Sequence, residues 1–437
     1  MKRKNNQTKK YSTETKLIYG KMATKKWDFN HHVIPPISSS ATFRLDTAKR
    51  GAQGFAEFAH STKDETITSR APIYIYDRLG EPNKELLEEN LAIAEEGEIA
   101  ITYSTGMAAV SAILGSLTGH GDEIIAHPML YGCTYSLLTN WYPRLQIKTK
   151  FIDLMKPENL THAINPQTRV IYFESPVNPT LDLIDIRTIV NIVKKANERR
   201  SKMRKIYVVI DNTFASPYCQ RPLSMGADFS VSSLTKSICG FGTDMGGVVV
   251  GPKWSYDILM LYRKDFGGTL AAKSAWPILV YGLPSLPVRM RRQMETAHEV
   301  ASFLENHPAV EFVAYPGLPS FKQSALAKIQ MRDYNGNFAP GGIIWFSLKG
   351  KNAKAQRDKG EAFINYLAHH AYSITLAVSL GHIRTLVEHP SSMTHSAIPL
   401  IEQVAKGLQP GGIRLSIGLE TAEDLLLDIS CALDHLP

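Results

Sequence analysis

Three separate segments of this chain carry residue types that could do chemistry together. Asp211 directly follows the apolar run of residues 208–210, and Lys236 ends a hydroxyl-rich segment, residues 228–236. Residues 104–107, Ser-Thr-Gly-Met, precede a run of small apolar residues that is typical of a helix. Ligands of open α/β sheets bind beyond the carboxyl ends of the strands, which is where we expect the aspartate and the lysine to lie.

Each of these features also has a simpler interpretation. Asp211 could ligate a metal, accept a hydrogen bond from a ribose or pair with a cationic ring nitrogen, although aspartates at strand ends are common. Lys236 could be an exposed loop charge, and Gly106 could allow a tight connection. Ser233 and Thr235, however, suit an anion site beside a nucleophilic amine, and N–H groups at a helix start bind phosphate. Together the segments predict a phosphate-bearing cofactor such as pyridoxal 5'-phosphate (PLP).

The elements that must position these residues alternate between strands and helices. Short apolar runs separated by helical or loop stretches predict a mostly parallel sheet with crossover helices. A helix is expected to begin at Pro82 and to end at Gly97. The expected strands are residues 123–126, 149–152, 170–173 and 206–210.

The pattern becomes α+β after about residue 285, with expected helices at 289–306 and 360–370 and strands at 341–348 and 413–416. The chain of 437 residues is longer than one hydrophobic core usually supports. We therefore expect three parts. They are an N-terminal basic tail and extended arm in residues 1–80, a large domain in residues 81–285 and a C-terminal α+β domain in residues 286–437. The arm includes an irregular stretch, residues 51–70, that suggests contact with a neighbouring subunit.

Composition excludes several classes of protein. The net charge is +8, and nine basic residues against one acid lie in residues 1–26, so that the remainder balances at 40 basic and 40 acidic residues. A nucleic-acid-binding protein would carry basic charge on its folded body. We find no run of ~20 apolar residues, and therefore expect no membrane span, and no secretory signal follows the basic start. Four scattered cysteines favour neither a disulfide framework nor a zinc site, so we expect no metal and a cytoplasmic location.

A series of ordered motifs from residue 34 to the C-terminus resembles the Cys/Met-metabolism (trans-sulfuration) family of PLP-dependent enzymes. The motifs are Tyr76-Asp77-Arg78, Ser104-Thr105-Gly106-Met107, Leu130-Tyr131-Gly132-Cys133, Glu174-Ser175-Pro176-Val177-Asn178-Pro179, Ile210-Asp211-Asn212-Thr213, Ser233-Leu234-Thr235-Lys236, Ser379-Leu380-Gly381, Glu388-His389-Pro390 and Ile413-Arg414-Leu415-Ser416. The resemblance implies fold type I of the PLP-dependent transferases, which is the aspartate aminotransferase-like fold. It also implies PLP as the cofactor.

The resemblance assigns a role to each motif. It implies that Lys236 binds PLP as a Schiff base and moves protons, that Asp211 pairs with the pyridinium nitrogen, and that Tyr131 stacks on the ring and acts as an acid or base. The remaining implied roles are phosphate binding by Gly106, Met107, Ser233 and Thr235, completion of that site by Tyr76 and Arg78 of the neighbouring subunit, and substrate carboxylate binding by Arg414, Ser379 and Asn178. A homo-oligomer with sites shared across a dimer, expected to be a tetramer, follows from these roles.

The choice of reaction within the family depends on a few positions. Cys133 and the pair Lys264-Asp265 are similar to methionine γ-lyases, so we expect γ-elimination of L-methionine to methanethiol, 2-oxobutyrate and ammonia, with Cys133 and Lys264 near the substrate. Residues 240–247 look more like the Gly-Thr…Gly-Gly run of sulfhydrylases. The alternative is therefore γ-replacement, as in O-acetylhomoserine sulfhydrylase or cystathionine γ-synthase. A non-catalytic scaffold is a distant alternative, because Lys236 and Asp211 are both present.

Overall fold

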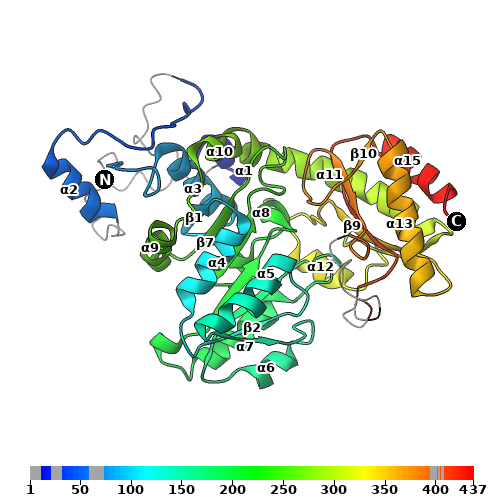
Figure 1. Ribbon diagram of the computed structural model, residues 1–437, viewed down its shortest axis with the longest axis horizontal. Helices are drawn as coiled ribbons and strands as arrows, with labels where there is room; N and C mark the ends of the chain where they lie inside the picture. Colours follow the sequence, from blue (N-terminus) through cyan, green and yellow to red (C-terminus); the bar gives the residue numbers. More distant parts are fainter. Residues whose placement is uncertain (1–10, 21–31, 59–72, 394–400, 402–403, 405–407) are drawn as a thin grey trace. The chain divides into compact units, whose positions relative to one another are not determined.

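The computed structural model describes the chain except for residues 1–10, 21–31, 59–72, 394–400, 402–403 and 405–407. Most of the basic tail and most of the segment from Glu57 to Arg70 therefore lie outside the described residues. The chain divides into two compact units (Figure 1). The first unit comprises Met1–Glu174, Asp185–Pro217 and Arg221–Ser285, and the second comprises Ser175–Ile184, Tyr218–Gln220 and Leu286–Pro437.

The first unit is built on a seven-stranded sheet, as far as the described residues show. In sheet order the strands are β1 (Ile99–Tyr103), β7 (Gly247–Gly251), β6 (Phe229–Ser233), β5 (Tyr207–Asp211), β4 (Thr168–Glu174), β2 (Glu123–Ala126) and β3 (Lys148–Phe151). The strands from β6 to β3 pair in parallel, and β7 pairs antiparallel with both β6 and β1. The prediction of a mostly parallel sheet is confirmed, and β1 and β7 are strands that the sequence pattern did not indicate.

Helices cover the faces of this sheet, which explains why its central strands read as continuous apolar runs. Helix α4 begins where Thr105 accepts a hydrogen bond from Ala108 N, and it packs against β6 and β7 (Figure 1). The helices up to α10 are α1 (Thr13–Tyr19), α2 (Ala48–Phe58), α3 (Pro82–Ala94), α4 (Gly106–Leu117), α5 (Gly132–Ser136), α6 (Glu158–Ala163), α7 (Ile186–Asn197), α8 (Ser216–Cys219), α9 (Tyr256–Phe266) and α10 (Ala272–Pro277).

The N-terminal region differs from the extended arm that the sequence suggested. Residues 51–58 of the stretch expected to be irregular belong to α2, and α1 precedes it. Helix α2 contains Gly51 and Gly54, and glycine lowers intrinsic helix propensity, so the local sequence pattern did not reveal it. Gly54 has a packing reason, because a Cβ atom there would lie 2.8 Å from Ile73 Cγ2.

The second unit has a five-stranded sheet among its described residues, and helices α13 and α15 lie side by side on it (Figure 1). In sheet order its strands are β10 (Ile374–Leu376), β11 (Thr385–Glu388), β12 (Gly412–Ser416), β9 (Ile343–Leu348) and β8 (Val310–Ala314). Its helices are α11 (Leu283–Asn306, which begins in the first unit), α12 (Ser324–Gln330), α13 (Ala353–His370) and α15 (Ala422–Asp434). Phe346 and Phe363 meet edge to face in its core.

Two short segments from the middle of the chain complete the second unit. The buried amide of Gln330 donates hydrogen bonds to Ser175 Oγ (3.1 Å), Ile184 O (3.2 Å) and Gln220 Oε1 (3.1 Å). These three acceptors lie in residues 175–184 and 218–220. None of the helices in the described part of the chain has both the length and the apolar character that a membrane span requires.

Candidate active site

The carboxyl ends of β4, β5 and β6 bring three predicted segments of the first unit together. Glu174, the last residue of β4, is in register with Asp211, the last residue of β5. Asp211 is in turn in register with Val231 of β6, two residues before Ser233. The parallel pairing therefore places Asp211 and Ser233 at the same edge of the sheet, as the sequence predicted.

Asp211 has an environment suited to a cationic ligand. Its carboxylate accepts hydrogen bonds from Thr213 N (2.9 Å) and Tyr172 Oη (3.3 Å), which are both neutral donors. The surrounding protein desolvates the group and raises the pKa of Asp211, and the hydrogen bonds from Thr213 and Tyr172 oppose that shift. Part of the residue is exposed, so a ligand can approach it. A positive charge beside this carboxylate would offset the cost of its desolvation.

The residue after Asp211 is tied to a buried acid. Asn212 Nδ2 donates a hydrogen bond to Glu95 Oε1 (3.0 Å), and both side chains are buried. Burial raises the pKa of Glu95 to about 7, and the hydrogen bond from Asn212 opposes the shift. This contact connects the end of β5 to the end of α3.

The start of α4 forms a close-fitting cradle beside β6 and β7. A Cβ atom on Gly106 would lie 2.9 Å from Ser233 Cβ, and one on Gly247 would lie 2.2 Å from the carbonyl oxygen of Thr105. Only glycines allow these approaches. The first N–H groups of a helix have no intrahelical acceptor, so those of Gly106 and Met107 are available to an anion.

The turn after β6 places Lys236 next to this cradle. Ser233 N donates to Thr213 Oγ1 (2.9 Å), and Lys236 N donates to Ser233 O (3.3 Å). Gly246 N donates to the hydroxyl oxygen of Thr235 (3.1 Å), which fixes the middle of the turn. Lys236 is partly exposed.

These residues fit PLP group by group. The cradle at Gly106 and the hydroxyls of Ser233 and Thr235 suit its phosphate, because a helix start and neutral donors bind such an anion. The desolvated carboxylate of Asp211 suits its protonated ring nitrogen. The amine of Lys236, on the same turn as Ser233, suits its aldehyde.

Tyr131 and Cys133 lie near the same edge of the first unit's sheet. Tyr131 N donates to Glu174 Oε1 (2.5 Å), and the Tyr131 side chain is exposed. Cys133 is also exposed, in the first turn of α5. The next residue, Thr134, donates to the sulfur of Met107 (3.6 Å) and so connects α5 to the start of α4.

Tyr76 and Arg78 lie in the N-terminal region of the first unit, and both are exposed. The Arg78 guanidinium lies 5.7 Å from the centre of the Tyr76 ring and donates a hydrogen bond to the carbonyl oxygen of Lys264. Lys264 Nζ pairs with Asp265 (3.3 Å). Among the described residues no hydrogen bond joins Arg78 to Gly106 or Ser233 of the same chain.

Arg414 collects three oxygen atoms within the second unit. Its guanidinium donates to Asn178 Oδ1 (3.1 Å) and to Ser379 O (2.8 Å), and it pairs with Glu388 Oε2 (2.9 Å). Ser379 has a positive φ of 106°, which is unusual for a residue with a side chain. Burial lowers the pKa of Arg414, and Glu388 opposes that shift. The structure thus brings the three predicted carboxylate-binding residues together.

Glu388 is a member of this cluster that the sequence did not assign. It faces Arg414 directly across the antiparallel pair of β11 and β12. Its place in the Glu388-His389-Pro390 motif was the available signal, but the sequence does not reveal the strand register that brings it opposite Arg414. A second residue not singled out is Glu174, whose carboxylate holds the backbone of Tyr131.

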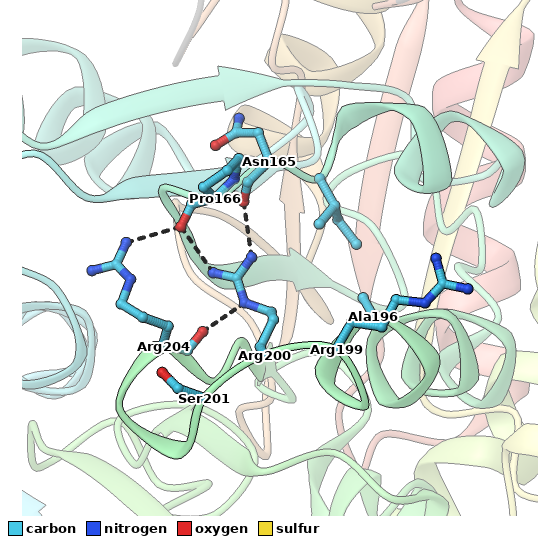
Figure 2. A pocket seen from close by; sticks show the side chains of 8 residues that line it. Asn165, Pro166, Ala196, Arg199, Arg200, Ser201 and Arg204 are labelled. Atoms are coloured by element: carbon cyan, nitrogen blue, oxygen red, sulfur yellow. Dashed lines mark hydrogen bonds between the residues drawn. The ribbon is translucent and has the colours of Figure 1, made fainter.

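A hollow of the first unit lies at the amino ends of its strands, away from these residues (Figure 2). Its lining consists of Ile164, Asn165, Pro166, Ala196, Arg199, Arg200, Ser201 and Arg204. The Arg200 guanidinium donates to the carbonyl oxygens of Asn165, Pro166, Thr168 and Arg204 at 2.6–3.0 Å. These acceptors occupy the N–H groups of the Arg200 guanidinium within the protein.

Comparison with known proteins agrees with this geometry. An L-methionine gamma-lyase of Pseudomonas deceptionensis is 39% identical over 98% of this chain and 99% of its own length. An L-methionine gamma-lyase of Treponema denticola is 38% identical over 92% of both chains. The crystal structure of a cystathionine gamma synthase from Xanthomonas oryzae superposes with a TM-score of 0.81 at 31% identity, over 97% of this chain and 98% of that chain. The family model described as "Cys/Met metabolism PLP-dependent enzyme" matches residues 14–434, and the chain belongs to that family.

Proposed function

We propose that this enzyme is an L-methionine γ-lyase, which converts L-methionine and water into methanethiol, 2-oxobutyrate and ammonia. The observation that carries the proposal is the cluster at the carboxyl edge of the seven-stranded sheet. There Asp211, the start of α4 and the turn of Lys236 provide one group for each part of PLP. The similarity to L-methionine gamma-lyases over more than nine-tenths of the chain supports the choice of substrate.

Lys236, Asp211 and the cradle divide the work of holding the cofactor. Lys236 binds the aldehyde carbon through its amine, and Asp211 keeps the ring nitrogen protonated. The N–H groups of Gly106 and Met107 bind the phosphate. The hydroxyl groups of Ser233 and Thr235 bind it as well. When bound, PLP withdraws electrons from the substrate, so that protons on Cα and Cβ become acidic and a group on Cγ can leave.

Proton transfer is the task of two side chains. The Lys236 amine is the base for the Cα proton and carries protons between positions on the substrate. Tyr131 stacks on the ring and donates a proton to the leaving sulfur atom. Its exposed side chain and its backbone contact with Glu174 support this placement.

Arg414 binds the substrate carboxylate, with help from Ser379 and Asn178. A guanidinium can make two parallel hydrogen bonds to a carboxylate, which fixes the orientation of Cα. Glu388 holds Arg414 from the neighbouring strand. We place Cys133 and Lys264 near the substrate as well. The position of Cys133 is supported by its exposure and by its place two residues after Tyr131.

The proposed assembly is a homo-oligomer in which a dimer shares its active sites and two dimers form a tetramer. Tyr76 and Arg78 complete the phosphate site of the neighbouring subunit, which agrees with their exposure on this chain. Residues 1–80 then form the part that reaches the neighbour, residues 81–285 the PLP-binding domain and residues 286–437 the C-terminal domain. We also propose a cytoplasmic location, because the four cysteines are thiols and not disulfides.

A product assay tests the reaction. The purified enzyme is loaded with PLP and given L-methionine alone, and 2-oxobutyrate and methanethiol are measured over time. Release of both in equal amounts is expected, and the Lys236→Ala variant should release neither. If the loaded enzyme releases neither product, the proposal of γ-elimination is wrong.

γ-Replacement is the second candidate, and the similarity to the cystathionine gamma synthase structure favours it. Under this alternative the γ-group leaves as well, and a thiol or sulfide then forms the new bond to Cγ. An O-acylated homoserine with sulfide or cysteine as the acceptor distinguishes the two reactions. A new thioether or thiol product formed faster than 2-oxobutyrate would favour replacement.

A further inference from the structure

Lys84 occupies an unfavourable place for a cation. It lies in the first turn of α3, where the helix dipole is positive, and its side chain is only 1% exposed. Burial lowers the pKa of Lys84, and the nearby Arg263 guanidinium lowers it further. A lysine in such a place needs strong compensating contacts, because an uncompensated buried charge is costly.

Those contacts connect the segment around Tyr76 and Arg78 to the rest of the first unit. The Lys84 ammonium donates to the carbonyl oxygen of Asp77 and pairs with the Asp77 carboxylate (2.7 Å). It also lies 3.1 Å from the hydroxyl oxygen of Thr269. An ammonium has three donors, and these three acceptors can use all of them. Asp77, the main partner, lies between Tyr76 and Arg78 in the sequence.

A second buried cation holds the end of the same turn. Arg263 donates to the carbonyl oxygen of Leu79 (3.2 Å) and pairs with Glu88 (2.6 Å). Leu79 N donates to Tyr76 O (2.9 Å), which closes the turn on itself. The backbone of residues 76–79 is therefore fixed from inside the unit at two points.

The side chains on this turn face two ways. Lys84 holds Asp77 on the inner side, whereas the Tyr76 and Arg78 side chains are exposed. The Arg78 guanidinium lies against the Tyr76 ring, so the two side chains form one exposed pair. The position of that pair depends on the backbone of Asp77, which Lys84 holds.

We infer that Lys84 is a positioning residue that acts across the subunit boundary: it holds the Tyr76 and Arg78 pair in place and so sets the PLP affinity of the neighbouring subunit's site. The inference rests on the proposed function, because it needs Tyr76 and Arg78 to bind phosphate in the neighbour. Lys84 has a second partner, Thr269. The residue before Thr269, Gly268, accepts a hydrogen bond at its carbonyl oxygen from Ser104 N (2.6 Å), just before α4 of the same chain. An effect within its own chain is therefore the competing explanation.

Two hybrid dimers separate these explanations. In the first, one subunit carries Lys84→Met and the other Lys236→Ala, so the subunit with an intact Lys236 receives Tyr76 and Arg78 from a subunit with an intact Lys84. In the second, a wild-type subunit is paired with one that carries both substitutions, so the site with the intact Lys236 receives Tyr76 and Arg78 from a subunit without Lys84. The hybrids have the same composition and are isolated through two different affinity tags.

The measured quantity is the dissociation constant of PLP at the site with the intact lysine. Binding is monitored through the visible absorbance band of the lysine-bound cofactor. The second hybrid should bind PLP about tenfold more weakly than the first, which is the effect of one charge-assisted contact. Equal affinities, or a loss confined to the first hybrid, would overturn the inference, because Lys84 would then not act on the neighbour. A general loss of stability affects both hybrids alike.

Control variants keep the test decisive. Lys273→Met replaces an exposed lysine of α10 and should change neither hybrid. If Lys84→Met does not fold, Asp77→Asn weakens the same contact and should give the same contrast. Hybrids made with Arg78→Ala test the premise: if they show no contrast, the shared site of the proposed function is wrong and the inference is wrong with it. Absence of the absorbance band in wild type would refute the lysine assignment instead.

Discussion

At the amino edge of the first unit's sheet, Arg200 gives its N–H groups to four carbonyl oxygens, among them those of Asn165 and Pro166 (Figure 2). Lys205 pairs with Asp228 (2.8 Å) at the same edge. At the carboxyl edge of the same strands, Asp211 is desolvated beside the neutral donors Thr213 and Tyr172. The start of α4 also points N–H groups to that edge. The amino edge uses its arginine and lysine in internal contacts, whereas the carboxyl edge presents a desolvated carboxylate and the N–H groups of a helix start.

The difference indicates how one sheet can serve two purposes. Satisfied hydrogen bonds at the amino edge stabilise the connections between strands. Groups that await a ligand at the carboxyl edge lower the free energy of unfolding of the ligand-free protein, and ligand binding raises it again. Substitutions at the two edges should therefore have opposite effects on activity and on stability.

Asp211→Asn should give the largest effect on activity and the clearest contrast. We expect kcat with L-methionine to fall by about 100-fold or more, the scale seen when a key electrostatic group is removed. The raised pKa means that the folded state without PLP loses stability as pH rises above the ordinary pKa of an aspartate. The PLP-free variant should therefore melt no lower than the PLP-free wild type at pH 7. A lower melting temperature would show that the carboxylate stabilises the fold.

Arg200→Gln should show the reverse pattern. Loss of the bonds to four carbonyl oxygens should lower the free energy of unfolding by about 2–3 kcal/mol. The KM and kcat for L-methionine should stay unchanged, because the residue lies at the opposite edge. Arg199→Gln is the matched control, an exposed arginine in the same hollow, and should change stability by no more than about 0.5 kcal/mol. A large change in kcat for Arg200→Gln would break the distinction between the edges.

Glu95→Gln should give the smallest effect, visible only as a change in pH dependence. Burial raises the pKa of Glu95 from 4.5 to about 7, so the folded state binds the proton more tightly than the unfolded state. Stability of the PLP-free enzyme should fall as pH rises from 4.5 to about 7 and should lose no more through this group above that range. The variant should lack this part of the decline in chemical denaturation at several pH values. An unchanged profile would show that Glu95 does not titrate in this range.

Sequence patterns predicted the parallel strands and the position of Asp211 and Ser233 at one edge of the sheet. Residues 170–173 and 206–210 are mostly buried apolar runs, and the structure places residues 170–173 in β4 and residues 207–210 in β5. Strands β7 and β1 were missed because Gly247–Gly251 follows a glycine-rich run and Ile99–Tyr103 follows Gly97, so both read as loop. A short apolar run next to glycine contains too few residues to show the alternation of apolar and polar residues that predicts a strand.

Pairings between distant residues could not be predicted. Glu388 faces Arg414 because of the register of β11 and β12, and no local pattern encodes a register. Lys84 and Asp77 are close in sequence, but the burial of their contact depends on Arg263 and Thr269, almost two hundred residues away. Local motifs therefore carried the predictions of ligand contacts, whereas contacts such as those of Glu388 and Lys84 depend on tertiary packing.

The way the second unit is assembled has a consequence for biosynthesis. Residues 175–184 leave the ribosome long before Gln330, whose buried amide needs Ser175, Ile184 and Gln220 as acceptors. During translation these segments must wait, incompletely folded, for residues 286–437. A fragment that begins at Leu286 would contain Arg414 but neither Asn178 nor the acceptors of Gln330. Dividing the gene at this boundary should therefore give an insoluble C-terminal product unless the two middle segments are supplied with it.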